Sequence, residues 1–143
     1  TQTRLDKDSV KEMFPYLTAG EYVCEKSMVS DKIPFAFNYT SGEANTFKSF
    51  AAEDSHGTHV AGIAAGNGQN VSGENQKYSL AGAAPEAQLL LLVAGDNQGY
   101  LYNNAIYAAY DDALYLEAFR AFFKRDYTIF HSHRYKACLI PIT

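Results

Sequence analysis

The chain lacks several features that would define large classes of protein. It has no apolar stretch near the ~20 residues of a membrane-spanning helix, and its longest strongly apolar run, residues 89–94, is typical of a buried strand. No signal peptide is recognisable and the first residue is not methionine, which indicates a removed leader or an excised piece. The net charge is −4, so nothing predicts a nucleic-acid partner.

Cysteine and glycine motifs exclude two further kinds of site. Cys24 and Cys138 are the only cysteines, and the sequence leaves open whether they form one long-loop disulfide or are two unrelated thiols, the simpler reading. No Cys-x-x-Cys pair is present for a structural zinc ion. The run Gly66-Asn67-Gly68 lacks the third glycine and the preceding strand of a dinucleotide-binding fingerprint.

The length and composition fit one globular domain with an unusual end. A chain of 143 residues that is 47% hydrophobic and 20% charged can bury a core. Residues 1–116 carry seven basic against fourteen acidic side chains, whereas residues 117–143 carry five against two, together with six aromatics. This abrupt change predicts a boundary near Glu117, with an unassigned tail after it.

Hydrophobic periodicity predicts an α/β fold with a mainly parallel sheet, because strands and helices alternate along the chain. Pro15 should limit the first helix and Pro34 should keep the first strand at a sheet edge. The expected elements are a helix over 8–16, a strand over 32–39, a small-residue helix over 56–66, a core strand over 88–93 and a helix over 103–116. The expected buried stripes are Val60, Ile63 and Ala64 on one helix, and Ile106, Ala109, Tyr110, Ala113 and Leu114 on the other.

The run DSHGTHVAGIAAGN, residues 54–67, places His56 at the start of the small-residue helix. An imidazole can accept and return a proton near neutral pH, and a helix start would hold it rigidly. Gly57 would leave room beside the ring, and Ser55 or Asp54 could cap the helix.

Histidine also has less specific uses, which stay open at this point. A histidine near a helix start is commonly structural or solvated. His56 and His59, three residues apart, could share a zinc ion, although no third ligand lies at a matching spacing. His131 and His133, in the basic tail, are expected to be exposed.

The string HGTHVAGIAAGN as a whole resembles the histidine signature of the subtilisin-like serine peptidases, the subtilases of peptidase family S8. The following AGAAPEAQLLL, residues 81–91, resembles the family turn that leads into a core strand. Residues 32–39 and 66–82 resemble the branch of cell-envelope proteinases and C5a peptidases, and residues 105–116 resemble the next family helix. The resemblance covers roughly residues 5–116.

The resemblance implies a partial subtilisin-like, three-layer α/β fold and a secreted or surface-displayed serine endopeptidase that acts on protein or peptide substrates. His56 matches the general base, and His59 matches a supporting position. Gln98 and Gly99 match the segment that pairs with bound substrate, as weak candidates. Calcium is common in the family, but the loop over 67–76 has only one acidic residue, so we predict no metal site and no cofactor.

The sequence also departs from the family pattern. Asp6 and Asp8 lie in a polar context instead of at the end of an apolar strand, so neither matches the catalytic aspartate. The nucleophilic serine turn and the asparagine segment of the oxyanion hole are absent, and residues 117–143 resemble nothing in the family, as a truncated gene or a shifted reading frame would produce. We therefore expect an incomplete fragment that is inactive alone. The alternative is a non-catalytic binding module on a subtilase scaffold.

Overall fold

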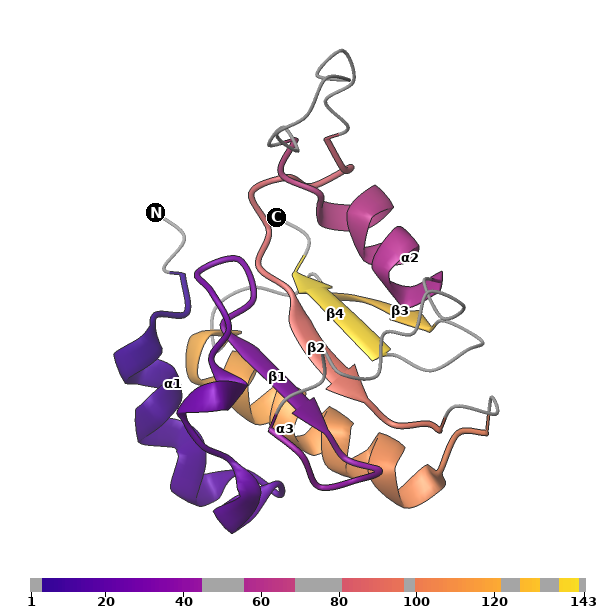
Figure 1. Ribbon diagram of the computed structural model, residues 1–143. Coiled ribbons are helices and arrows are strands. Elements are labelled where there is room, and N and C mark those ends of the chain that lie inside the picture. The colour runs from indigo at the N-terminus through magenta and orange to yellow at the C-terminus, as the bar shows by residue number, and fades with distance from the viewer. Residues whose placement is uncertain are drawn as a thin grey trace.

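The computed structural model describes residues 4–44, 56–68, 81–96, 100–121, 127–131 and 137–141. The elements in chain order are α1 (Lys7–Met13), three short 3-10 helices (Phe14–Tyr16, Gly20–Tyr22 and Glu25–Ser27), β1 (Phe35–Asn38), α2 (His56–Ala65), β2 (Leu90–Val93), α3 (Asn103–Ala121), β3 (Tyr127–His131) and β4 (Ala137–Pro141). The described strands form one sheet in the order β1-β2-β4-β3 (Figure 1).

The centre of the fold is a β-α-β unit. β1 and β2 pair in parallel, from Phe35 opposite Leu90 to Asn38 opposite Val93, and α2 lies between them in the chain. Parallel neighbours need such a crossover connection. The predicted α/β class is therefore confirmed. The C-terminal hairpin adds two antiparallel pairings, β2 with β4 and β4 with β3.

β1 lies at one end of the strand order, as Pro34 predicted. The strand is more deeply covered than its alternating pattern suggested. Phe35 and Phe37 enter the main core, and Ala36 and Asn38, which point to the opposite face, are buried as well. A strand covered on both faces is typical of the parallel part of an α/β sheet.

The main core packs α1 and α3 against the sheet. Figure 1 shows α3 crossing one side of β1 and β2, with α1 next to β1. This cluster consists of Leu5, Val10, Met13, Leu17, Ala19, Val23, Phe35, Phe37, Leu90, Leu92, Ala109, Ala113 and Leu116. A smaller cluster joins α2 to the segments that precede β1 and β2, through Ala65 and Leu89 with Ile33, Ala61, Ala64 and Ala87 packed around them.

Each of the two predicted stripes is buried only in part. In α2, Ile63 is 62% exposed, and the buried contact is made by Ala65 with its alanine neighbours. In α3, Leu114 is 57% exposed, whereas the buried positions are Ala105, Ala109, Asp112, Ala113 and Leu116. Periodicity located both helices, and it correctly placed Ala109 and Ala113 in the core. On α3 it counted Leu114 as buried and missed Asp112, because a carboxylate is not expected on a buried face.

The helix ends differ from the expected ones. α1 begins after Asp6, whose side chain accepts a hydrogen bond from the Ser9 backbone N–H. It gives way to the 3-10 turn that contains Pro15. α3 continues to Ala121, past the predicted boundary at Glu117; that boundary stays a prediction. Within the described parts of the chain, no helix is long and apolar enough to cross a membrane.

Asp112 is a buried carboxylate, 1% exposed, on the inner face of α3. One carboxylate oxygen accepts a hydrogen bond from the Thr18 N–H, and the other accepts from the Ala19 N–H at 3.1 Å and from the Tyr39 hydroxyl at 2.8 Å. The Thr18 hydroxyl also donates to the Ala108 carbonyl on α3. This network joins α3 to the N-terminal segment and to the end of β1, because a buried carboxylate must find partners there.

Tyr39 should make the protein sensitive to alkali. Burial, together with the charge of Asp112 and the hydrogen bond to it, raises the pKa of the Tyr39 hydroxyl above its ordinary value of 10.0. A raised folded-state pKa contributes stability below the unfolded pKa, and this contribution is lost as the pH rises above about 10. We expect Tyr39→Phe to be less stable than the parent chain at neutral pH, by about 1 kcal/mol, and to lose less stability above pH ~10.

Urea unfolding of both proteins at neutral pH and at about pH 11 measures this difference. The difference in free energy of unfolding between the parent chain and Tyr39→Phe should become smaller, or change sign, at the higher pH. A gap that does not change with pH would show that the Tyr39 hydroxyl is not linked to folding.

Candidate active site

The chain topology brings two predicted site segments to one edge of the sheet. β1 runs toward the start of α2, α2 returns, and β2 runs parallel to β1. The first residue of α2, His56, and the segment after β2 therefore both lie at the carboxyl edge of the parallel strands, where α/β sheets commonly bind ligands (Figure 1). The side chain of His56 and the capping candidates Asp54 and Ser55 lie outside the described residues.

The far end of α2 is fixed by the segment that leads into β2. The last four carbonyl groups of a helix have no partner within it. Here the backbone N–H groups of residues 82–84 donate to three carbonyl groups at the end of α2 and just after it. The bonds run from Ala83 N to Ile63 O (2.9 Å), from Ala84 N to Ala64 O (2.8 Å) and from Gly82 N to Gly66 O (2.8 Å). A glycine is required at position 82, because an added Cβ would lie 2.6 Å from the backbone nitrogens of Ala65 and Gly66.

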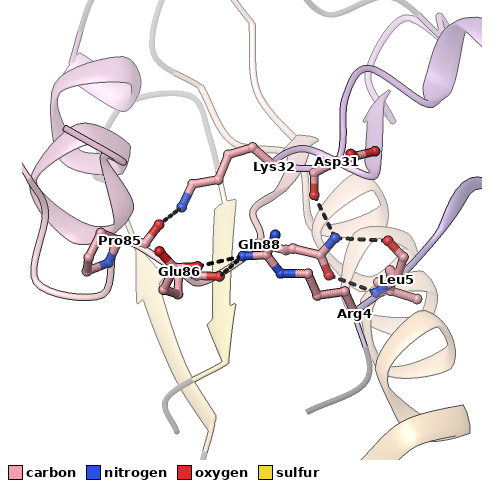
Figure 2. A network of polar contacts seen from close by, with 7 residues as sticks. All are labelled: Arg4, Leu5, Asp31, Lys32, Pro85, Glu86 and Gln88. Atoms are coloured by element: carbon pink, nitrogen blue, oxygen red, sulfur yellow. Dashed lines mark hydrogen bonds and ion pairs between the residues drawn. The ribbon is translucent and has the colours of Figure 1, made fainter. Parts of the chain in front are cut away.

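Gln88 connects the start of β2 to two other segments, as Figure 2 shows. Its amide nitrogen donates to the Leu5 carbonyl at 2.9 Å and to the Asp31 carbonyl at 2.6 Å, and its amide oxygen accepts from the Leu5 N–H at 2.8 Å. The backbone N–H of Leu89 adds a bond of 2.8 Å to the Lys32 carbonyl. These contacts set the position of β2 relative to β1.

Two basic side chains hold the turn before Gln88 (Figure 2). The Lys32 ammonium donates to the Pro85 carbonyl at 2.6 Å. Burial lowers the pKa of Lys32, and the carboxylate of Glu86 partly opposes this effect. Arg4 donates to both the carbonyl and the carboxylate of Glu86 at 3.0 Å, an exposed ion pair that adds little stability.

Asp96 connects the two ends of the turn that follows β2. The Asp96 N–H donates to the Tyr100 carbonyl at 3.0 Å, the Asp96 carboxylate accepts from the Tyr100 N–H at 3.2 Å, and it accepts from the Tyr102 hydroxyl at 2.6 Å. This last hydrogen bond raises the pKa of Tyr102. The substrate-contact candidates Gln98 and Gly99 lie between these anchors, outside the described residues.

The residue pattern alone predicts no role for Tyr102. A tyrosine six residues after an aspartate, across a short turn, is the signal that could have indicated this anchor.

No metal centre is visible in the described part of the chain: no three or more His, Cys, Asp or Glu side chains there are placed to hold an ion. His59 is exposed on α2. The loop candidate for calcium lies mostly outside the described residues, as does His133, so the metal and cofactor expectations stay predictions. Cys24 is a free, exposed thiol.

Comparison with known proteins agrees with the motif. The model of the subtilase family, peptidase S8, matches residues 19–121. A PII-type proteinase of Lactococcus lactis subsp. cremoris is 34% identical over 89 residues, which is 62% of this chain and 4% of that protein. A C5a peptidase of Streptococcus pyogenes is 42% identical over 76 residues, which is 53% of this chain and 5% of that protein. No solved structure matches the chain significantly.

The β-α-β unit and the segments gathered at its carboxyl edge define an α/β protein. Because the family model covers well over half of the residues, the chain belongs to the subtilase family of S8 peptidases. The chain spans about 4–5% of the length of these relatives.

Proposed function

We propose that this chain carries the histidine-bearing part of a subtilisin-like serine endopeptidase, with His56 as the general base. The observation that supports this most is the family match across residues 19–121, which includes the histidine signature at the start of α2. In this role the His56 imidazole takes the proton of a serine hydroxyl as it attacks a peptide carbonyl, and then returns it to the leaving amine.

We propose peptide or protein substrates, with Gln98 and Gly99 as contacts to the substrate backbone, and a secreted or surface location. We further propose that these 143 residues do not hydrolyse peptides by themselves, because no segment in them matches the family's aspartate strand or serine turn. One member of a catalytic triad without its nucleophile and oxyanion hole leaves no acyl-transfer chemistry.

A chimaera tests the role of His56. Residues 56–96 of this chain would replace the corresponding segment of the PII-type proteinase, whose other segments would supply the missing groups. We expect the chimaera to keep peptidase activity and its His56→Ala variant to lose about 10⁶ in kcat, as loss of the histidine does in subtilisin. A His56→Ala variant within tenfold of the parent chimaera would contradict the assignment.

A fluorophosphonate probe, which labels nucleophilic serines, tests whether the unmodified 143-residue chain is inactive. Intact-mass measurement should find no labelled serine. Stoichiometric labelling that denaturation abolishes would reveal a nucleophile among these residues and overturn the proposal.

The second candidate is a non-catalytic binding module on the same scaffold. The four-stranded sheet and its buried core favour a chain that folds on its own. Peptide binding that persists in the His56→Ala variant, with no hydrolysis in either protein, would favour this module over the peptidase.

A further inference from the structure

β2 has a second edge, opposite β1, which the C-terminal hairpin covers. β4 pairs with β2 in antiparallel orientation, with Leu139 opposite Leu90, Cys138 opposite Leu91 and Ala137 opposite Leu92. β3 then pairs with β4 at the outer side, and Figure 1 shows this hairpin beside β2. The parallel part of the sheet is therefore extended by a segment from the other end of the chain.

The apolar composition of β2 favours an uncharged strand as its neighbour at this second edge. β2 reads Leu-Leu-Leu-Val, and three of its four residues are buried. Such a strand belongs inside a sheet, because an open edge would leave its outward N–H and C=O groups without partners. β4, with the sequence Ala-Cys-Leu-Ile-Pro, has no charged residue and meets this need.

Net charge also favours the association of the hairpin with the rest of the chain. Residues 117–143, which contain the hairpin, have a net charge of +3, and residues 1–116 have a net charge of −7. Opposite net charges promote the encounter of the two parts whether they belong to one chain or to two.

The ladder between β4 and β2 is short. It has three residue pairs, whereas β1 and β2 share four. β4 ends at Pro141, which has no N–H with which to extend a ladder. β4 also contacts α2 and α3, so the rest of the chain, as well as β3, positions this strand.

We propose that this edge of β2 is a strand-acceptor site, and that the C-terminal hairpin exchanges between copies of the chain. In an exchanged dimer, the hairpin of one copy covers β2 of the other. Every pairing described above is then kept between chains, so exchange needs no new surface. This proposal is independent of the peptidase assignment.

Cross-linking within the register tests the proposal. In a Cys24→Ser background, Leu91→Cys places a thiol opposite Cys138. Opposed residues in an antiparallel pair have Cα atoms about 4.5 or 5.5 Å apart, and both distances suit a disulfide. A second variant, Leu92→Cys with Ala137→Cys in a Cys24→Ser/Cys138→Ser background, uses the neighbouring pair, so that one of the two has the closer geometry.

Equal amounts of ¹⁴N- and ¹⁵N-labelled full-length chain would be mixed at low and high concentration, incubated, oxidised and mapped by peptide mass spectrometry. We expect disulfides between positions 91 and 138 within one chain at low concentration. At high concentration we expect the same disulfide to join light and heavy chains in dimers. The variant Leu91→Cys with Cys24→Ser and Cys138→Ser is the control, since it can form only random 91–91 dimers.

Two results would overturn the proposal. Cross-links that stay within single chains at every concentration would mean that the hairpin does not exchange. Absence of a cross-link in both register pairs, in variants that keep the parent circular dichroism spectrum, would mean that β4 is not seated on β2.

Discussion

Replacing Asp112 with alanine is expected to lower the free energy of unfolding by about 3 kcal/mol or more. The substitution leaves the Thr18 and Ala19 N–H groups and the Tyr39 hydroxyl without the carboxylate that accepts their hydrogen bonds. Hydrogen bonds to a charged acceptor contribute about 1.5–3 kcal/mol each, and a buried donor left unsatisfied has a large desolvation penalty. Urea unfolding followed by circular dichroism measures the loss.

The neighbouring aspartate is the matched control. Asp111 is exposed on the same turn of α3, so Asp111→Ala should change stability by no more than about 0.5 kcal/mol. Asp112→Asn should fall between the two, because an amide keeps one acceptor oxygen and places donors against donors. Equal stabilities of Asp111→Ala and Asp112→Ala would show that the buried network does not hold α3 to the N-terminal segment.

The sequence was sufficient to locate the main helices and strands. β1, α2, β2 and α3 each lie within or over the predicted ranges, because their signals are local: a period of two over residues 32–39, small residues over 56–66, an apolar run over 88–93. Pro34 also indicated the edge position of β1. The ends of α1 and α3 shifted by a few residues, where several residues could terminate a helix equally well.

The buried carboxylate could not be predicted in this way. Asp111 and Asp112 are adjacent and identical, and a charged pair on a helix usually faces solvent. What turns Asp112 inward is a pair of N–H groups more than 90 residues earlier in the sequence. No periodicity records a contact of that kind, and for this reason the predicted stripe of α3, correct at Ala109 and Ala113, included the exposed Leu114 and missed Asp112.

In the candidate site, too, local sequence predicts some features and contacts between distant residues determine the others. The motif around His56 predicted the start of a helix, and the helix begins at that residue. The hydrogen bonds at Asp96 come from two tyrosines four and six residues further along the chain, on the other side of the turn after β2. Local pattern therefore gives the position of a site segment on its element, whereas the anchoring contacts arise from the fold.

Replacing Gly82 with alanine should damage the fold more than a single added methyl group suggests. The new Cβ would lie 2.6 Å from two backbone nitrogens of the α2 terminus and 2.8 Å from the Ala64 carbonyl carbon. Backbone atoms cannot rotate away as a flexible side chain can, so the segment 82–84 must withdraw from α2. We expect a loss of about 2–3 kcal/mol, from the strain of overpacking and from weaker hydrogen bonds to the helix carbonyls.

Gly62→Ala is the matched control, because it adds the same methyl group within α2, the helix against which Gly82 packs. Nothing lies within 4 Å of a Cβ at position 62, and alanine is favoured over glycine inside a helix by about 1 kcal/mol. Gly62→Ala should therefore be neutral or stabilising, while Gly82→Ala destabilises. Amide hydrogen exchange adds a local test, since the N–H groups of Ala83 and Ala84 should lose protection only in Gly82→Ala. If both variants unfold at the same urea concentration as the parent chain, the junction at Gly82 does not fix α2, and the orientation of the helix that begins at His56 must depend on other contacts.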